Sequence, residues 1–205
     1  TVYIASDTDQ MNRVYEGNEA GFTYAREGNP NAEQLAAKIA QLEGADACLI
    51  TSSGMSAVTA IVLGLLHAGD HLVAGNQLYG RTLRLVSREL PRLGFATSLV
   101  DACNPAAVEA AIQPNTRMIL VEVVSNPLLR VVDVEALGRI ACSRGVQLVV
   151  DNTFPTPLAL RPFEWGASVV FHSVTKMLAG HSDVTLGAVC CPRELLTPIR
   201  DTIVT

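Results

Sequence analysis

The sequence predicts an α/β protein, built on a mostly parallel seven-stranded sheet with helices on both faces and preceded by an extended N-terminal arm. From Ala45 onward, short apolar runs alternate with helical patterns, which is typical of a parallel sheet whose strands are joined by helices. Of the 205 residues, 49% are apolar and only 17% are charged, so most segments can pack into a sizeable core.

The first part of the chain, residues 1–44, is expected to be an arm followed by one helix. Residues 1–30 carry Gly, Asn, Asp and Thr without sustained periodicity, whereas a helical pattern runs over residues 31–42. Arms of this kind often lack a core of their own and pack on a partner subunit, so we expect a homo-oligomer.

Residues 45–205 are expected to form one large domain. Its candidate strands are the apolar runs 47–51, 71–74, 96–100, 118–124, 146–151, 168–172 and 186–190, and its candidate helices are 54–67, 81–93, 105–112 and 134–144. The last strand follows a loop instead of a helix, which allows mixed strand directions. The pattern over 194–203 indicates a helix that is still unfinished near the end of the sequence, as in part of a longer polypeptide.

Charge and cysteine content narrow the function classes. The net charge is −5 and the arginines are scattered among acidic residues, which argues against binding to nucleic acid or to a membrane surface. The five cysteines lie mostly in apolar runs without CxxC spacing, so we expect reduced thiols and a cytoplasmic protein. No apolar run reaches the roughly 18 to 20 residues of a membrane span, and no signal-peptide pattern is present.

Lys176 is the first candidate functional residue. The chain has only two lysines, and Lys38 lies in a helical pattern typical of a solvated face. Lys176 instead follows an apolar run and stands among hydroxyl-bearing residues. A lysine that forms a Schiff base must be partly neutral near pH 7, and so must be desolvated or lie near another positive charge. A lysine capping a surface turn would explain this segment alone equally well.

Two other strand ends carry candidate binding groups. Gly54 and Met55 follow the run 47–51 at the start of a helix, where free N–H groups and the helix dipole favour an anion such as phosphate; a simple helix cap is the alternative. Asp151 ends a buried apolar strand, where a carboxylate is costly unless it is paired or hydrogen-bonded. A role in capping the following loop is the alternative there.

Together these three sites predict a cofactor. Asp151 precedes Lys176 by one strand, so both can face one crevice at the carboxyl ends of neighbouring strands. An anion-binding helix start, a carboxylate that pairs with a protonated pyridine nitrogen and an imine-forming amine are the groups that recognise pyridoxal 5′-phosphate, PLP. No histidine, cysteine or carboxylate lies at metal-ligand spacing to His172 or His181, so no metal is expected.

Five segments of the chain resemble the Cys/Met-metabolism family of PLP enzymes. They are Tyr24-Ala25-Arg26 with Asn29-Pro30, Ser53-Gly54-Met55, Leu78-Tyr79-Gly80-Arg81-Thr82, Asp151-Asn152-Thr153-Phe154, and Ser173-Val174-Thr175-Lys176 with Gly180-His181-Ser182-Asp183. The family includes cystathionine γ-synthase, cystathionine γ- and β-lyases, methionine γ-lyase and O-acetylhomoserine sulfhydrylase. The resemblance covers nearly all 205 residues and implies the large domain of a fold-type I, aspartate aminotransferase-like PLP enzyme.

The resemblance implies a role for each matching residue in binding the cofactor. Lys176 matches the lysine that is bonded to the cofactor and moves protons, and Asp151 matches the partner of the pyridine nitrogen. Tyr79 matches a catalytic tyrosine stacked over the ring. The other matches are the phosphate cradle (Gly54, Met55, Ser173, Thr175), Asn126 with Glu122 beside the phenolic oxygen, and Tyr24 with Arg26, which reach the neighbouring subunit's cofactor phosphate. A catalytic dimer, usually paired into a tetramer, is implied.

The resemblance also implies a reaction class, namely γ-elimination or γ-replacement on a sulfur-containing or O-acylated amino acid. Cystathionine γ-lyase or γ-synthase is preferred, followed by O-acetylhomoserine sulfhydrylase and then by methionine γ-lyase or cystathionine β-lyase. Arg81 stands where typical methionine γ-lyases have cysteine. The family's smaller C-terminal domain, which carries the arginine for the substrate carboxylate, would begin beyond Thr205. A protein that binds PLP but is catalytically incomplete is therefore the alternative of another class. A nicotinamide-binding domain is disfavoured because the first βα turn lacks G-x-G-x-x-G.

Overall fold

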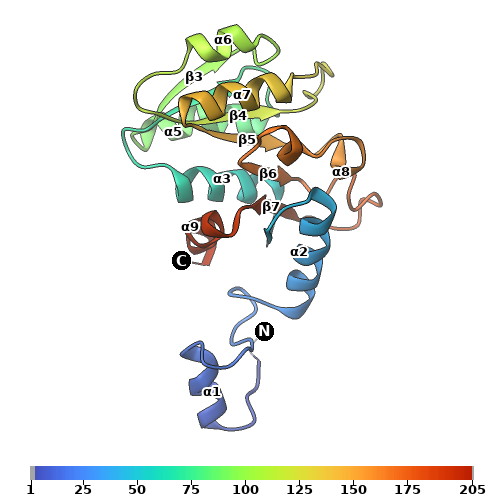
Figure 1. Cartoon of the computed structure of the whole chain (residues 1–205). Helices are drawn as coiled ribbons and strands as arrows, with labels where there is room; N and C mark the ends of the chain where they lie inside the picture. Colours follow the sequence, from blue (N-terminus) through green and yellow to red (C-terminus); the bar gives the residue numbers. More distant parts are fainter. Residues whose placement is uncertain (1–2, 205) are drawn as a thin grey trace.

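The computed structural model describes residues 3–204, so the first two residues of the expected arm and the last residue of the chain lie outside the described part. Its centre is a seven-stranded sheet, which confirms the predicted fold class (Figure 1). The spatial order of the strands is β1-β7-β6-β5-β4-β2-β3. Their bounds are β1 (Ala47–Thr51), β2 (His71–Gly75), β3 (Ala96–Val100), β4 (Thr116–Glu122), β5 (Gln147–Asp151), β6 (Val169–His172) and β7 (Gly187–Cys191).

Strand directions are mixed, as the loop before the last strand allows. The neighbours from β6 through β5, β4 and β2 to β3 are parallel, whereas β7 runs antiparallel to both β1 and β6. Since β5 and β6 are parallel neighbours, their carboxyl ends lie side by side at one edge of the sheet. This is the arrangement expected for Asp151, at the end of β5, and for the segment after β6 that carries Lys176.

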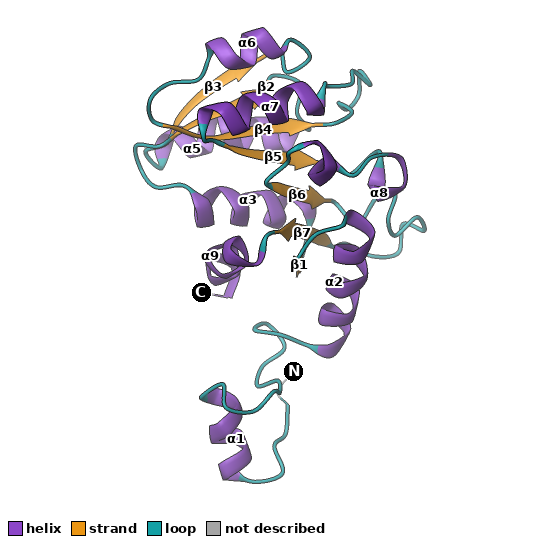
Figure 2. Cartoon of the chain, viewed as in Figure 1, coloured by secondary structure: helices purple, strands orange, loops and turns teal. Residues whose placement is uncertain are grey.

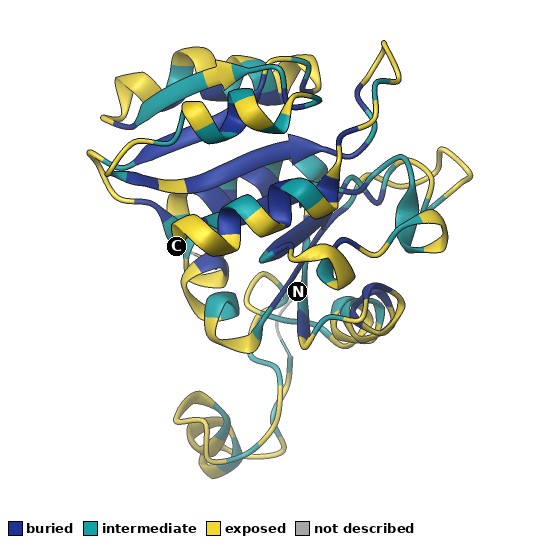
Figure 3. Cartoon of the chain, turned by 45° about the horizontal axis from the view of Figure 1, so that its top comes forward, coloured by how far each residue is buried: buried dark blue, intermediate teal, exposed yellow. Residues whose placement is uncertain are grey.

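Helices cover both faces of the sheet (Figure 2). One face packs against α3 (Gly54–Leu65), η1 (Leu85–Glu89), α5 (Leu90–Arg92) and α9 (Arg193–Val204), and the other against α2 (Pro30–Glu43), α6 (Pro105–Ala110) and α7 (Val134–Arg144). Successive strand residues alternate between the faces: Val149 belongs to the first core, and Leu148 and Val150 to the second. The central strands are buried on both faces because each of the two alternating sets of side chains packs into one of these cores (Figure 3).

The helix expected over 81–93 is present as a continuous helical segment over 80–92, but it is not a regular α-helix throughout. The segment consists of α4 (Gly80–Arg84), the π-helical turn η1 and the short α5. Pro91 has no backbone N–H to donate, so a regular α-helical ladder cannot pass through it. The Leu90 N–H bonds to the Leu85 carbonyl five residues back instead. Two short elements, α8 (Thr156–Ala159) and the 3₁₀ turn η2 (Pro162–Trp165), were not predicted because they are too short to show periodicity.

The segment expected to be an extended arm contains a helix that was not predicted, α1 (Thr8–Tyr15). Asp7 caps this helix by accepting a hydrogen bond from the Gln10 N–H at 2.7 Å, and the Ser6 N–H donates to the Gln10 side chain. Asp followed three residues later by Gln is a signal for a helix start that the absence of periodicity obscured. Figure 1 shows α1 apart from the sheet and its covering helices. Among the described helices, none is both long and apolar enough to cross a membrane.

Candidate active site

A cavity of about 260 Å³ opens at the carboxyl ends of β4, β5 and β6, beside the start of α3. Nine residues predicted from the sequence line it, and they come from five separate chain segments: Gly54, Met55, Tyr79, Glu122, Asn126, Asp151, Ser173, Thr175 and Lys176. The order of strands in the sheet brings these segments together, as expected for a ligand site of an open α/β sheet.

Two carboxylates lie side by side on the sheet edge of this cavity. Glu122 and Asp151 are paired across β4 and β5, and both line the cavity. Burial raises the pKa of Asp151, although hydrogen bonds from Thr153 oppose the rise. Burial and, secondly, the charge of Asp151 raise the pKa of Glu122 to about 7, while N–H groups of Tyr79 and Asn126 oppose it. This edge would be stabilised by a positively charged partner, such as a protonated ring nitrogen.

The raised pKa of Glu122 predicts a pH-dependent stability. The folded protein holds a proton on Glu122 between pH 4.5 and about 7 that the unfolded chain releases. Protonation of Glu122 therefore stabilises the folded protein fully below pH 4.5, and this stabilisation is lost as the pH rises from 4.5 through about 7. The free energy of unfolding falls by roughly 3 kcal/mol at most over this range. Glu122→Gln keeps an oxygen for the Tyr79 N–H but cannot ionise. We expect urea denaturation to show the variant gaining stability over the native protein from about pH 5 to about pH 8.

The matched control for this measurement is Glu135→Gln, because Glu135 is exposed and pairs with Arg139 on the surface of α7. That substitution should leave the pH dependence of stability unchanged. A constant stability difference between Glu122→Gln and the native protein across the same pH range would contradict the assignment of the buried proton.

Thr153 was missed as a site residue, although its segment was singled out. Its backbone N–H donates to Asp151 Oδ1 at 2.9 Å, its hydroxyl donates to the same oxygen, and it accepts the Ser173 N–H at 2.8 Å. Thr153 thus orients the Asp151 carboxylate and joins the ends of β5 and β6. The spacing of two residues from Asp151 was the available signal, because alternate residues of an extended segment point to the same side.

The start of α3 has the form of an anion site. Ser53 caps the helix by accepting the Ser56 N–H at 3.1 Å, and the Ser56 hydroxyl in turn accepts the Ser53 N–H at 2.9 Å. Gly54 and Met55 line the cavity and are the first helical residues, whose backbone N–H groups have no acceptor within an α-helix. Together with the helix dipole they favour a bound phosphate.

Gly54 also allows α3 to approach the end of β6 closely. A Cβ at position 54 would lie 2.8 Å from the Ser173 Cβ and 3.0 Å from its Cα. Gly54→Ala is therefore expected to push the helix start away from Ser173, to destabilise the protein by about 1 to 3 kcal/mol and to weaken phosphate binding. Thermal melting and PLP titration measure the two effects. Gly80→Ala is the control, since a Cβ there meets nothing within 4 Å; equal losses in both variants would contradict the close-approach argument.

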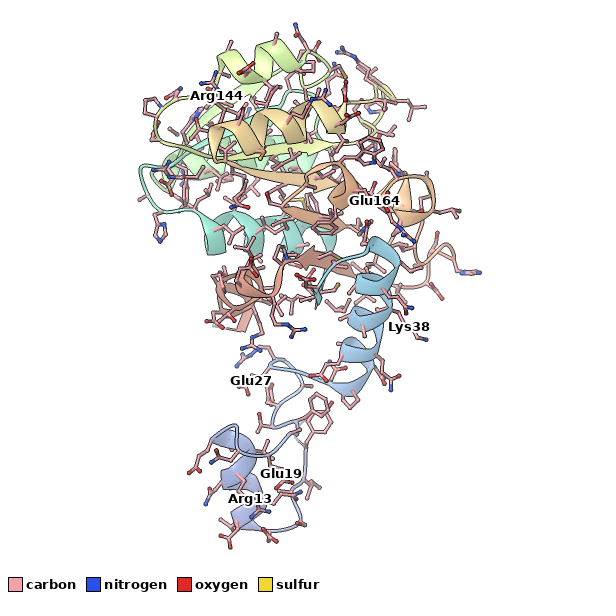
Figure 4. All side chains as sticks on the ribbon, viewed as in Figure 1. Arg13, Glu19, Glu27, Lys38, Arg144 and Glu164 are labelled. Carbon is pink, nitrogen blue, oxygen red and sulfur yellow. The ribbon has the colours of Figure 1, made fainter. Side chains whose placement is uncertain are left out.

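Lys176 lines the cavity, but its side chain is exposed, contrary to the expected desolvation. The reason is its place in the turn after β6, where its N–H bonds to the Ser173 carbonyl and its own carbonyl accepts the Gly180 N–H. Such a turn projects from the sheet edge and is not packed between layers. Lys38 is exposed on α2, outside the residues that line the cavity, in agreement with a solvated face (Figure 4).

Three other predicted residues, Thr175, Tyr79 and Asn126, differ in how freely their side chains can contact a ligand in the cavity. The Thr175 hydroxyl donates to the Leu186 carbonyl at 3.1 Å and accepts the Leu186 N–H at 3.0 Å, so its only proton is directed at the backbone. Tyr79 is 47% exposed, with its N–H bonded to the Glu122 carboxylate. Its ring can therefore contact a ligand. Asn126 is exposed at the cavity wall after β4.

Tyr24 and Arg26 do not line this cavity. They lie on the arm, where the Arg26 guanidinium carbon is 5.3 Å from the centroid of the Tyr24 ring, and both side chains are exposed. The stacked pair thus presents a positive charge and a hydroxyl to solvent in the part of the chain that the structure describes. Their predicted contact with a neighbouring subunit stays a prediction.

The residues present suit PLP. A helix start with free N–H groups matches its phosphate, the pair of buried carboxylates matches a protonated ring nitrogen, and the exposed amine of Lys176 matches its aldehyde. The fold and the cavity therefore define a PLP-binding α/β domain.

Comparison with known proteins agrees with this class and narrows it to a family. A family model described as Cys/Met metabolism PLP-dependent enzyme matches residues 1–200. L-methionine γ-lyase of Porphyromonas gingivalis is 40% identical over 98% of this chain and 50% of its own length. The chain belongs to the Cys/Met-metabolism family of PLP-dependent enzymes, as its motifs predicted.

Solved structures agree with this assignment. Cystathionine γ-lyase from Lactobacillus plantarum, complexed with L-serine, matches with a TM-score of 0.88 and 34% identity over 99% of this chain and 51% of that chain. A putative O-acetylhomoserine (thiol)-lyase from Campylobacter jejuni, which carries a pyridoxyl-lysine phosphate, matches with a TM-score of 0.88 and 30% identity over 97% of this chain and 49% of that chain. The present chain thus spans about half the length of these relatives.

Proposed function

We propose that this chain is a PLP-dependent enzyme of the trans-sulfuration type that catalyses γ-elimination or γ-replacement on a sulfur-containing or O-acylated amino acid. The observation that carries the proposal is the meeting of nine predicted residues, from five chain segments, in one cavity. When bound, PLP supplies an electron sink that stabilises negative charge at the substrate's Cα.

The proposed roles follow from chemistry and position. Lys176 holds the cofactor through its amine and moves protons at the substrate's carbon atoms. Asp151, oriented by Thr153, pairs with the ring nitrogen. The N–H groups of Gly54 and Met55 and the Ser173 hydroxyl bind the phosphate, with Thr175 shaping the wall through its bonds to Leu186.

Two further groups complete the proposed site. Tyr79 would contact the cofactor ring and donate a proton to the departing γ substituent, and its half-exposed side chain leaves it free to contact substrate. Asn126 would bind the phenolic oxygen, and Glu122 lines the same cavity from the end of β4.

The activities are proposed in the order cystathionine γ-lyase or γ-synthase, then O-acetylhomoserine sulfhydrylase, then methionine γ-lyase or cystathionine β-lyase, so the candidate substrates are cystathionine, O-acylated homoserines and methionine. Arg81 is exposed directly after the Tyr79 segment, where a methionine γ-lyase would have cysteine, which favours the first two. The relatives include methionine γ-lyase, cystathionine γ-lyase and a putative O-acetylhomoserine (thiol)-lyase, so all three substrates belong in the test.

The test is a turnover assay of the PLP-loaded protein with each substrate, with and without an added thiol or sulfide. Formation of an α-keto acid without a thiol indicates elimination, and formation of a new thioether or thiol-bearing amino acid indicates replacement. Binding of PLP without turnover of any of these compounds would contradict the proposed activity.

We also propose a homodimer that shares its active sites, further paired into a tetramer. The support is the expected arm before α2, whose helix α1 lies apart from the sheet and its covering helices and whose exposed Tyr24 and Arg26 are not among the residues that line the cavity. A native mass of one subunit would contradict it. A cytoplasmic location is proposed as well, since all five cysteines are free thiols.

A further inference from the structure

Three polar side chains are completely buried directly behind the candidate active site. They are Glu43, the last residue of α2, Asn152, which follows β5, and His172, the last residue of β6, each 0% exposed. The Glu43 Oε1 atom accepts from His172 Nε2 at 2.5 Å and from Asn152 Nδ2 at 2.9 Å. Asn152 Nδ2 also donates to the Leu160 carbonyl at 2.9 Å. One carboxylate oxygen thus joins the ends of two strands to a helix.

Two of these residues, Asn152 and His172, alternate with residues of the cavity along β5 and β6. Asp151 and Thr153, on either side of Asn152, line the cavity, and so do Phe171 and Ser173, on either side of His172. Since consecutive residues of extended chain point to opposite sides, Asn152 and His172 hold the strand ends from the face covered by α2. On the cavity face the same strand ends are joined by Thr153, which donates its N–H to Asp151 and accepts the N–H of Ser173.

The cluster is a poor source of stability. Within the described part of the chain, Glu43 Oε2, Asn152 Oδ1 and His172 Nδ1 are buried side-chain atoms without a hydrogen-bond partner. Each buried polar atom left unpaired costs about 1 to 3 kcal/mol, and an apolar cluster of the same volume would avoid that cost. Compared with apolar packing, the cluster fixes the relative orientation of the two strand ends, because hydrogen bonds set angles and register and apolar contacts do not.

We propose that Glu43, Asn152 and His172 are positioning residues for the cofactor site. They hold the carboxyl ends of β5 and β6 so that Asp151 and the Lys176 turn face one cavity. Glu43 also ties that geometry to α2, the helix that directly follows the arm. The proposal rests on the proposed function, because it needs the cavity to bind PLP.

The chain offers a matched control in His71, which is also a buried histidine, 1% exposed, in a polar cluster. Its Nδ1 is 2.7 Å from Thr116 Oγ1, and its Nε2 is 2.9 Å from Ser98 Oγ. His71 is the first residue of β2, so it lies at the amino ends of the parallel strands, opposite the cavity. A purely structural role would make His71 and His172 respond alike.

The test compares His172→Leu, His172→Gln and His71→Leu in the full chain. Three quantities are measured: the melting temperature, the affinity for PLP by titration, and the rate at which Lys176 acquires a borohydride-reducible pyridoxyl group. We expect His172→Leu to weaken PLP affinity or slow the reaction of Lys176 by about tenfold or more. His71→Leu should lower the melting temperature but leave both PLP readouts within about twofold of the native protein. His172→Gln, which restores a donor toward Glu43, should recover part of the loss.

Equal PLP readouts for His172→Leu and His71→Leu, whatever their melting temperatures, would overturn the proposal. If His172→Leu does not fold, Asn152→Leu provides the same test, because leucine has a similar volume but removes the amide that joins the end of β5 to Glu43 Oε1. Native-like PLP readouts in a folded Asn152→Leu would also overturn the proposal. Failure of the proposed function is distinguishable, since the native protein itself would then form no adduct on Lys176.

Discussion

Lys176→Ala is expected to abolish turnover and the covalent link to PLP, with a loss of about a thousandfold or more in the rate of reaction. Alanine offers no amine to bond the cofactor's aldehyde and no base to move protons at the substrate's carbon atoms. The fold should be retained, because the Lys176 side chain is exposed in a turn. Absorbance of the protein-bound cofactor and the turnover assay measure the two losses, and thermal melting checks the fold.

Lys38→Ala is the matched control for this experiment. Lys38 is the other lysine of the chain, and it is exposed on α2 away from the cavity. Its removal should leave cofactor absorbance and turnover at native values. Retention of the cofactor link in Lys176→Ala, or its loss in Lys38→Ala, would contradict the assignment of the reactive amine.

Asp151→Asn is expected to have two effects of opposite sign. Asparagine keeps an oxygen for the Thr153 N–H but loses the negative charge that pairs with a protonated ring nitrogen. Removing one member of a buried charge pair costs about 2 to 5 kcal/mol, so PLP affinity or turnover should fall roughly 30-fold to several thousandfold. PLP titration and single-turnover kinetics measure this loss.

The stability of the cofactor-free protein should respond differently to the same substitution. Burial raises the pKa of Asp151, so the ionised carboxylate in the folded state costs stability as the pH rises through that pKa. Asparagine removes this cost and the repulsion of Glu122. We expect Asp151→Asn to be at least as stable as the native protein at neutral pH. Reduced stability with native PLP affinity would contradict both parts of the prediction.

The sequence predicted the bounds of a helix or strand best where the local pattern of residues itself marked both ends. The strands 47–51 and 96–100 and the helix 134–144 have the bounds that their apolar patterns predicted, and Asp133 and Gly145 mark the ends of that helix by capping it. The bounds of the other strands differ from the predicted ones by one or two residues at one or both ends, because a run buried on both faces does not show where pairing begins. The π turn at 85–89 depends on how the missing N–H of Pro91 is accommodated, which no pattern reveals.

The candidate site was predictable to the extent that each residue stands at a strand end or a helix start. Asp151, Gly54 and Lys176 were found in this way, and the sheet order then placed them together. Two features of the site were not predictable in this way: the exposure of the Lys176 side chain and the hydrogen bonds of Thr175 to Leu186. Both depend on how the turn after β6 folds back toward β7. The Glu43 cluster joins residues 109 and 129 positions apart, so no local pattern could predict it.

The most direct test of the central claim is borohydride reduction of the native protein with PLP, followed by peptide mass analysis of the modified lysine. The chain contains only Lys38 and Lys176, so the result assigns the reactive amine without ambiguity. The account predicts a pyridoxyl group on Lys176 and none on Lys38. A folded protein that carries the group on Lys38, or on neither lysine, would contradict it.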